Sequence, residues 1–266
     1  MKVIIPMSKS TFVIYLFFFS VLAMAQNTKA VFTDSVQIVA GQYFGKDILG
    51  YDYYAKNNIL YKQKKSEKRE YKNLSLGEIH SVDLINPLKI LIFYKEFNSV
   101  VLLDNQLSEI MKITLNGFNL VAQTCSVASQ NRFWIYDNLS NQLVLFDYLN
   151  KKANPINQPF KNTFKYYNSH YNYWMRISEE NEIYTYDNYG KVTQSGKIPT
   201  FEEILITDSG KILFTSSGNL YLYQVDKNTA IHIFSFEKKI EKFDFKNGFL
   251  TLFTGDVLYN YKINLP

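Results

Sequence analysis

Cysteine is almost absent from this chain of 266 residues, which contains a single one, Cys125. No intramolecular disulfide is therefore possible, and stability has to come from side-chain packing. Cys125 lies in the small-residue segment AQTCSVAS, where no charged neighbour would activate a thiol. We therefore expect a buried, unreactive side chain and not a catalytic nucleophile.

Histidine and the common catalytic motifs are also scarce. The three histidines, His80, His170 and His232, are far apart in the sequence and form neither a His-x-His nor a His-Glu-x-x-His pair. The chain has no Gly-x-Ser-x-Gly nucleophile elbow, no phosphate-binding glycine loop and no Cys-x-x-Cys pair. These absences argue against a histidine zinc site, and they predict no cofactor.

A strong charge of one sign is missing as well. The formal net charge of +5 is too small to indicate a polyanionic partner, and we expect no contact with nucleic acid. The basic residues concentrate in one segment, KQKKSEKREYK from Lys62, which Glu67 and Glu70 interrupt. We interpret it as a solvated edge strand or loop, with contact to an anionic lipid or sugar surface as the alternative.

Long apolar runs are lacking except near the N-terminus. Lys2 and Lys9 precede the apolar segment TFVIYLFFFSVLA, which starts at Thr11. This segment ends at the small residue Ala23, and Ala25 lies two positions further on. This pattern predicts that residues 1–25 are a signal peptide, because about 13 apolar residues fall short of the roughly 20 that span a membrane. No cysteine adjoins the cleavage site, so we expect an exported protein, periplasmic or associated with the outer membrane, that is not a lipoprotein and keeps no transmembrane segment.

The most informative pattern that is present is a hairpin signal repeated about every forty residues, which is the spacing of propeller blades. Each copy has two β-rich runs that meet at a polar turn, for example ILIFYKEFNSVVLLDN from Ile90 and KILFTSSGNLYLYQVD from Lys211. The turns lie around Asn58, Asn98, Asn141, Asn181, Gly218 and Gly255. Aromatic residues for a large core are plentiful, with 21 Phe, 21 Tyr and 2 Trp.

We therefore predict an all-β fold in which residues 26–266 form a single six-bladed β-propeller of four-stranded antiparallel blades. The second repeat should contain strands at 79–84, 88–94, 100–104 and 109–115, and the fifth at 201–207, 211–215, 219–225 and 230–236. The last repeat lacks an outer strand, whereas a spare strand precedes the first. We expect residues 30–40 to fill that gap by pairing with residues 257–263, which would close the ring.

An outer-membrane β-barrel is the structural alternative, because such barrels are also exported and rich in aromatic residues. Their strands alternate between apolar and polar residues, whereas runs such as ILIFY and LVLF are continuously apolar. A strand buried on both faces between neighbouring blades explains continuous runs better, so the sequence favours the propeller.

Two segments carry a resemblance to a known family. NPLKILIFYKEFNSVVLLDNQLSEI from Asn86 and SQNRFWIYDNLSNQLVLFD from Ser129 resemble an uncharacterised family of exported proteins from Bacteroidota. The resemblance implies a propeller-like envelope protein with no assigned catalytic residues. It also implies association with the periplasm or the outer membrane.

The densest aromatic segment is FKYYNSHYNYWMR, which starts at Phe164. Alternation along a strand would place about half of its rings in the core. We expect the others to offer a contact surface to a protein partner, because Tyr and Trp are enriched at the energetic centres of interfaces. The candidates are Tyr166, Tyr167, Tyr171 and Trp174.

One enzymatic alternative remains open. A six-bladed propeller has room for a metal at its axis, and oxygen ligands from several first strands suit calcium. The candidate ligands are Asp47, Asp83, Asn168 and Asp244. The alternative function is thus a calcium-dependent hydrolase of a lactone or sugar ester. The favoured function is a non-catalytic scaffold or binding module that contacts another envelope protein or an outer-membrane complex.

Overall fold

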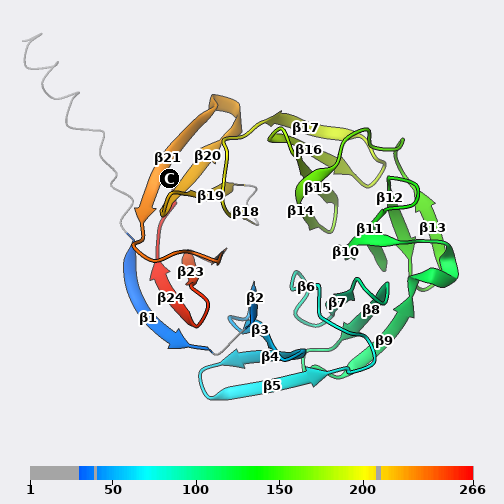
Figure 1. The fold of residues 1–266 in the computed structure, drawn as a ribbon, viewed down its shortest axis with the longest axis horizontal. Helices are drawn as coiled ribbons and strands as arrows, with labels where there is room; N and C mark the ends of the chain where they lie inside the picture. Colours follow the sequence, from blue (N-terminus) through cyan, green and yellow to red (C-terminus); the bar gives the residue numbers. More distant parts are fainter. Residues whose placement is uncertain (1–29, 39–40, 208–210, 266) are drawn as a thin grey trace, which may run out of the picture.

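A computed structural model describes residues 30–38, 41–207 and 211–265, so the predicted signal peptide lies outside the described residues. Strands β1 to β24 fill this part of the chain, with two short 3-10 turns, η2 (Leu115–Phe118) and η3 (Val225–Lys227). Six sheets stand around a central axis (Figure 1). None of the described residues forms a helix long and apolar enough to cross a membrane.

Each blade is a four-stranded antiparallel sheet whose first strand faces the axis. The first three blades contain β2 (Gln42–Lys46), β3 (Asp52–Lys56), β4 (Ile59–Lys64) and β5 (Glu67–Lys72); β6 (Ser81–Asp83), β7 (Ile90–Tyr94), β8 (Ser99–Leu103) and β9 (Glu109–Thr114); and β10 (Ala122–Ala128), β11 (Arg132–Asp137), β12 (Gln142–Asp147) and β13 (Lys152–Pro155). The last three contain β14 (Phe164–His170), β15 (Tyr173–Ser178), β16 (Glu182–Asp187) and β17 (Val192–Lys197); β18 (Ile204–Ile206), β19 (Ile212–Ser216), β20 (Asn219–Gln224) and β21 (Thr229–Ser235); and β22 (Lys242–Lys246), β23 (Phe249–Phe253), β24 (Val257–Lys262) and β1 (Val31–Gln37).

The sixth blade closes the ring as the sequence predicts. Its strand order is β1-β24-β23-β22, so the first strand of the chain takes the outer position. The pairing is antiparallel and runs from Val31 opposite Lys262 to Gln37 opposite Val257. Most side chains of β1 are exposed, so backbone hydrogen bonds contribute more to this closure than apolar burial does.

The six predicted turn residues all have a left-handed backbone. The φ angles are 63° at Asn58, 45° at Asn98, 56° at Asn141, 65° at Asn181, 72° at Gly218 and 96° at Gly255. Asparagine and glycine tolerate this conformation better than other residues do. This tolerance explains why the hairpin signal in the sequence is so regular.

The apolar side chains form one cluster at each of the six interfaces between neighbouring blades. β7 and β8 are buried along their whole length, because each is covered by a blade on either face. The continuous apolar runs of the sequence therefore have the origin that we predicted.

Antiparallel order divides the loops between the two sides of the ring. The turns from first to second strand and from third to fourth strand open on one side, which we call side A. The turns from second to third strand and the connections between blades lie on the other, side B. Every loop discussed below belongs to one of these sides.

Candidate functional site

An axial channel with a volume of about 420 Å³ runs between the first strands of the blades. Three of the four residues that we predicted as metal ligands line it: Asp83 on β6, Asn168 on β14 and Asp244 on β22. The two carboxylates are already used to join neighbouring blades. Asp83 accepts a hydrogen bond of 2.8 Å from the backbone N–H of Val127, and Asp244 accepts one of 2.7 Å from that of Lys46.

A β-bulge in β2 directs the Lys46 amide toward Asp244. The register shifts between Tyr43 and Gly45, and Gly45 has a φ of +134°, which few other residues adopt. A Cβ atom at this position would lie 3.5 Å from a carboxylate oxygen of Asp244. Burial raises the pKa of both Asp83 and Asp244, and the backbone donors offset part of that effect.

The fourth predicted ligand, Asp47, does not line the channel, and we correct the prediction on this point. Its buried carboxylate lies in the β2–β3 turn, where it accepts hydrogen bonds of 2.9 Å from the N–H of Tyr51 and 3.0 Å from the hydroxyl of Tyr53. These bonds fix the turn. Among the described residues no three His, Cys, Asp or Glu side chains form a group that could hold a metal ion.

The three histidines lie in three different blades. His80, which directly precedes β6, and His170 on β14 line the channel. The ring of His170 stacks on that of Tyr173, with 5.6 Å between the ring centres. Burial, followed by the charge of Lys95, lowers the pKa of His80. His232 is on β21 and faces Ser235 at 3.0 Å.

The structure confirms the prediction for Cys125 and only part of the prediction for the basic segment. Cys125 is buried as predicted, and burial, with a smaller effect of Asp83, raises the pKa of its thiol. β5 is the edge strand of the first blade, again as predicted. Lys62 is not solvated, however, because its ammonium group donates a hydrogen bond of 2.8 Å to the carbonyl of Asn105 and lies 4.3 Å from the ring centre of Tyr51.

The predicted aromatic contact group is split between three environments. Trp174 is 0% exposed and packs against Tyr136 and Phe164, so it has no surface to offer and we remove it from the predicted contact surface. Tyr166 and Tyr167 line the axial channel, where burial raises the pKa of both hydroxyls. Tyr171 alone lines a second cavity, on side A, and a partner-binding role for these three tyrosines stays a prediction.

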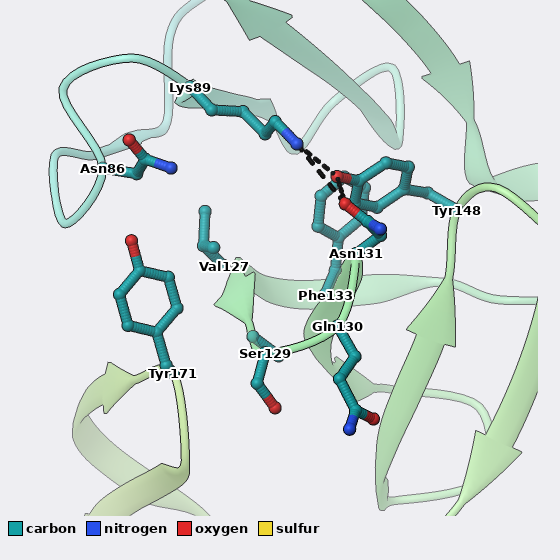
Figure 2. Close-up of a pocket in the computed structure, with 10 residues that line it drawn as sticks. Asn86, Lys89, Val127, Ser129, Gln130, Asn131, Phe133, Tyr148 and Tyr171 are labelled. Carbon is teal, nitrogen blue, oxygen red and sulfur yellow. Dashed lines mark hydrogen bonds between the residues drawn. The ribbon is translucent and has the colours of Figure 1, made fainter.

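This second cavity, which we call the Tyr171 cavity, has a volume of about 180 Å³. Turns from three blades form it: the β6–β7 turn with Asn86 and Lys89, the β10–β11 turn with Asn131, and the β14–β15 turn with Tyr171. Figure 2 shows Asn86 and the Tyr171 hydroxyl on one side, Lys89 along the top and Val127 at the centre. Polar groups thus surround a partly apolar floor.

Local hydrogen bonds hold these turns in place. The Asn86 side-chain oxygen accepts a bond of 3.0 Å from the N–H of Leu88, which shapes the β6–β7 turn. The N–H of Ser129 donates to the carbonyl of Tyr171 at 2.9 Å and so joins the third and fourth blades. Asn131 has a φ of 56° in the tight β10–β11 turn. The cavity wall is therefore preorganised by the fold.

Lys89 is the one charged residue that lines the Tyr171 cavity. Its ammonium group donates to the hydroxyl of Tyr148 at 2.9 Å and to the amide oxygen of Asn131 at 3.4 Å (Figure 2). The Tyr148 hydroxyl in turn donates to the same Asn131 oxygen at 2.9 Å. Among the described residues, the salt bridges are Lys46–Asp52 and Arg69–Glu67, so Lys89 forms no salt bridge there.

Sequence reasoning identified only Tyr171 of this cavity. Asn86, Lys89 and Asn131 belong to two other repeats and follow no spaced motif. The sequence indicates only their location: all three lie in turns between the first and second strands of their repeats.

The fold is similar to that of several solved structures. A streptogramin B lyase matches with a TM-score of 0.60 and 12% sequence identity over 90% of this chain and 100% of its own. The β-propeller domain of Cps50 (Swd1) from Myceliophteria thermophila matches with a TM-score of 0.58 and 8% identity over 89% and 100%, respectively. BBS1N, in a complex with ARL6DN, matches with a TM-score of 0.56 and 10% identity over 85% and 78%. At these identities the likeness shows the propeller fold alone.

No protein-family model and no curated protein sequence matches the chain. The resemblance to an exported family of Bacteroidota therefore stays a prediction.

Proposed function

We propose that this propeller is a non-catalytic binding module that contacts another protein through side A of the ring. The observation that carries the proposal is the Tyr171 cavity, in which rigid turns of three blades direct polar side chains toward a partly apolar floor. A preformed concave site with an apolar lining and a few polar groups is typical of ligand recognition, and this one could receive a side chain of a partner. It requires no catalytic group.

The fold by itself does not choose between binding and catalysis. The similar propellers include one whose name gives it as a lyase and one whose structure holds a partner protein. For this chain the calcium-dependent hydrolase gains no support from the channel, because Asp83 and Asp244 bind backbone amides of the next blade and Asp47 fixes a turn. We therefore keep the binding function as the proposal.

The proposed location is the periplasm or the outer membrane, with another envelope protein or an outer-membrane complex as the partner. The support for this part is the predicted signal peptide at residues 1–25 and the resemblance of the second and third repeats to exported proteins. No nucleic acid is expected as a partner.

Exposed apolar residues provide a matched pair of sites for the test. Leu88 is 62% exposed in the β6–β7 turn on side A, beside the Tyr171 cavity. Leu139 is 67% exposed in the β11–β12 turn on side B. Because the two side chains are identical and similarly exposed, truncation of each compares the two sides of the ring with little effect on folding.

The experiment is affinity capture of proteins from native envelope extracts, followed by measurement of the affinity for the purified partner. We expect Leu88→Ala or Tyr171→Ala to weaken binding by about 1 kcal/mol or more. Leu139→Ala should bind like the wild type. A partner that is lost with Leu139→Ala and retained with both side A variants would contradict the proposal, and a calcium-dependent rise in melting temperature would favour the hydrolase.

A further inference from the structure

We propose that the Tyr171 cavity binds the carboxylate of an Asp or Glu side chain that projects from the partner protein. This inference rests on the proposed function and adds the chemistry of the partner. It follows from the charge of Lys89, the hydrogen-bond donors around the cavity, the size of the cavity and the distribution of charge over the two sides of the ring.

Lys89 supplies a positive charge that forms no salt bridge with a carboxylate of the described residues. Its side chain is half-buried, and its hydrogen-bond partners, Tyr148 and Asn131, are neutral. An ammonium group has three N–H donors, so two neutral acceptors leave one donor for a ligand. A carboxylate that entered the cavity would provide both a third acceptor and a negative charge at hydrogen-bond distance from the ammonium group.

Two further donors reach the same cavity. The Asn86 oxygen accepts from the N–H of Leu88, which leaves the Asn86 amide nitrogen as the group available to a ligand. The hydroxyl of Tyr171 bonds to no described residue and faces Asn86 across the cavity in Figure 2. An ammonium, an amide and a hydroxyl therefore surround one space, and an ionised carboxylate is a ligand that only accepts hydrogen bonds.

The size of the cavity fits one side chain. Its volume of about 180 Å³ is similar to that of a cavity of roughly 150 Å³ that holds one benzene molecule. Val127 and the ring of Phe133 are buried lining residues that would pack against the methylene groups of the ligand.

The distribution of charged residues between the loops of side A and side B favours a carboxylate carried by an acidic protein surface. The described loops of side A contain no glutamate and three aspartates, Asp47, Asp104 and Asp226, of which Asp47 and Asp104 accept hydrogen bonds within their own turns. These loops carry Lys65, Lys89, Lys151, Lys191, Lys211 and Lys227. The loops of side B carry Glu78, Glu96, Glu179, Glu180, Glu202, Glu203, Glu237, Glu241 and Asp256, together with Lys95, Lys161, Lys238 and Lys239. An acidic protein surface would therefore approach side A with favourable electrostatics.

The test uses a fluorescein-labelled Gly-Glu-Gly-Glu-Gly peptide and the same peptide with Gln in place of Glu, with binding followed by fluorescence anisotropy. We expect the Glu peptide to bind the whole chain about tenfold or more tightly than the Gln peptide. Lys89→Met should weaken Glu-peptide binding by about tenfold, and Lys89→Arg, which keeps the charge, by less. The matched control is Lys191→Met, an exposed lysine of side A outside the cavity, which should bind like the wild type.

Equal binding of the Glu and Gln peptides, or equal loss with Lys89→Met and Lys191→Met, would overturn the inference. Free acetate or free glutamate that binds as tightly as the peptide would also overturn it, because the ligand would then be a small molecule. If the Glu peptide does not bind but Leu88→Ala still weakens capture of the native partner, the carboxylate inference fails and the proposed function stands. If Leu88→Ala and Tyr171→Ala leave capture unchanged, the proposed function fails.

Discussion

The side chain of Asn98, in the β7–β8 turn of the second blade, holds the backbone of Ala122, the first residue of β10 in the third blade. The N–H of Ala122 donates to the Asn98 oxygen at 2.9 Å, and the Asn98 amide donates to the carbonyl of Leu120 at 2.6 Å. Asn58 does the same one blade earlier, with bonds to the N–H of Ile79 and the carbonyl of Gly77. Asn58 and Asn98 thus set their hairpin turns and also direct the chain into the next blade.

Replacement of Asn98 should therefore destabilise the fold. Asn98→Gly keeps the left-handed backbone but leaves the Ala122 N–H and the Leu120 carbonyl without their partner, at about 1–3 kcal/mol for each group. We expect the free energy of unfolding in urea to fall by about 2–6 kcal/mol. Asn141→Gly is the control, because the Asn141 side chain accepts one weak bond of 3.3 Å from Tyr136. Equal effects of the two substitutions would contradict the role that we assign to Asn98.

Removal of β1 should open the ring. A chain that starts at residue 41 leaves β24 as an unpaired edge, and it removes the buried side chain of Ile38. We expect a loss of several kcal/mol of stability and a tendency to associate through the exposed edge. Urea denaturation and size-exclusion chromatography measure the two effects. A truncated chain that stays monomeric and unfolds at the same urea concentration would show that closure by β1 is dispensable.

Cys125 should behave as a packing residue. Its thiol is buried among Leu91, Val127 and Ile135, and burial raises its pKa, so little reactive thiolate forms at neutral pH. We expect a thiol reagent to label the native protein at least about a hundredfold more slowly than the unfolded chain. Cys125→Ala should retain partner binding. Rapid labelling of the folded protein at neutral pH would disprove this interpretation.

Asp244 should make stability depend on pH. Burial raises its pKa above the ordinary value of 3.8, although Lys246, the Lys46 amide and Lys242 offset part of the shift. Because the folded state holds this proton more tightly, the contribution is fully present below pH 3.8 and is lost as the pH rises through the folded-state pKa. Asp244→Asn keeps an oxygen that accepts from Lys46 and removes the titration.

The stability of the Asp244→Asn variant should therefore rise relative to that of the wild type as the pH increases from about 4, by at most about 1.4 kcal/mol per pH unit. Urea titrations of both proteins between pH 3.5 and 8, within roughly the range where native carboxylates titrate, measure the difference. A difference that does not change with pH would mean that the folded-state pKa is not raised.

The architecture could be predicted because its signal is local. The turn between the second and third strands of each blade needs a residue with a left-handed backbone. Asn or Gly at that position of the sequence therefore indicates the hairpin. The predicted ends of the strands were less accurate where side-chain hydrogen bonds shape the adjoining turn. The second strand of the second blade begins at Ile90 and not at residue 88, because the Asn86 side chain draws Leu88 into the preceding turn.

The candidate site could be predicted only in part, since exposure in a propeller depends on neighbouring blades. Along β15 the residues from Trp174 to Ser178 are all buried, so alternation in the sequence does not indicate which rings reach a surface. The position of Lys89 gives no sign that Asn131 and Tyr171, which lie in the next two blades, will surround it. That information arises only when the ring is assembled.

The pairing of β1 with β24 determines the order in which the molecule can be completed. A hydrogen bond of 2.6 Å joins Asp34 to Asn260, which are 226 positions apart in the chain. The first five blades consist of strands that follow one another, so none of these sheets needs a strand from the other end of the chain. β1 precedes all other strands in the chain, and its partner β24 follows all the others. The ring can therefore close only when residues 257–262 are present, and a chain interrupted before residue 257 would lack the strand with which β1 pairs.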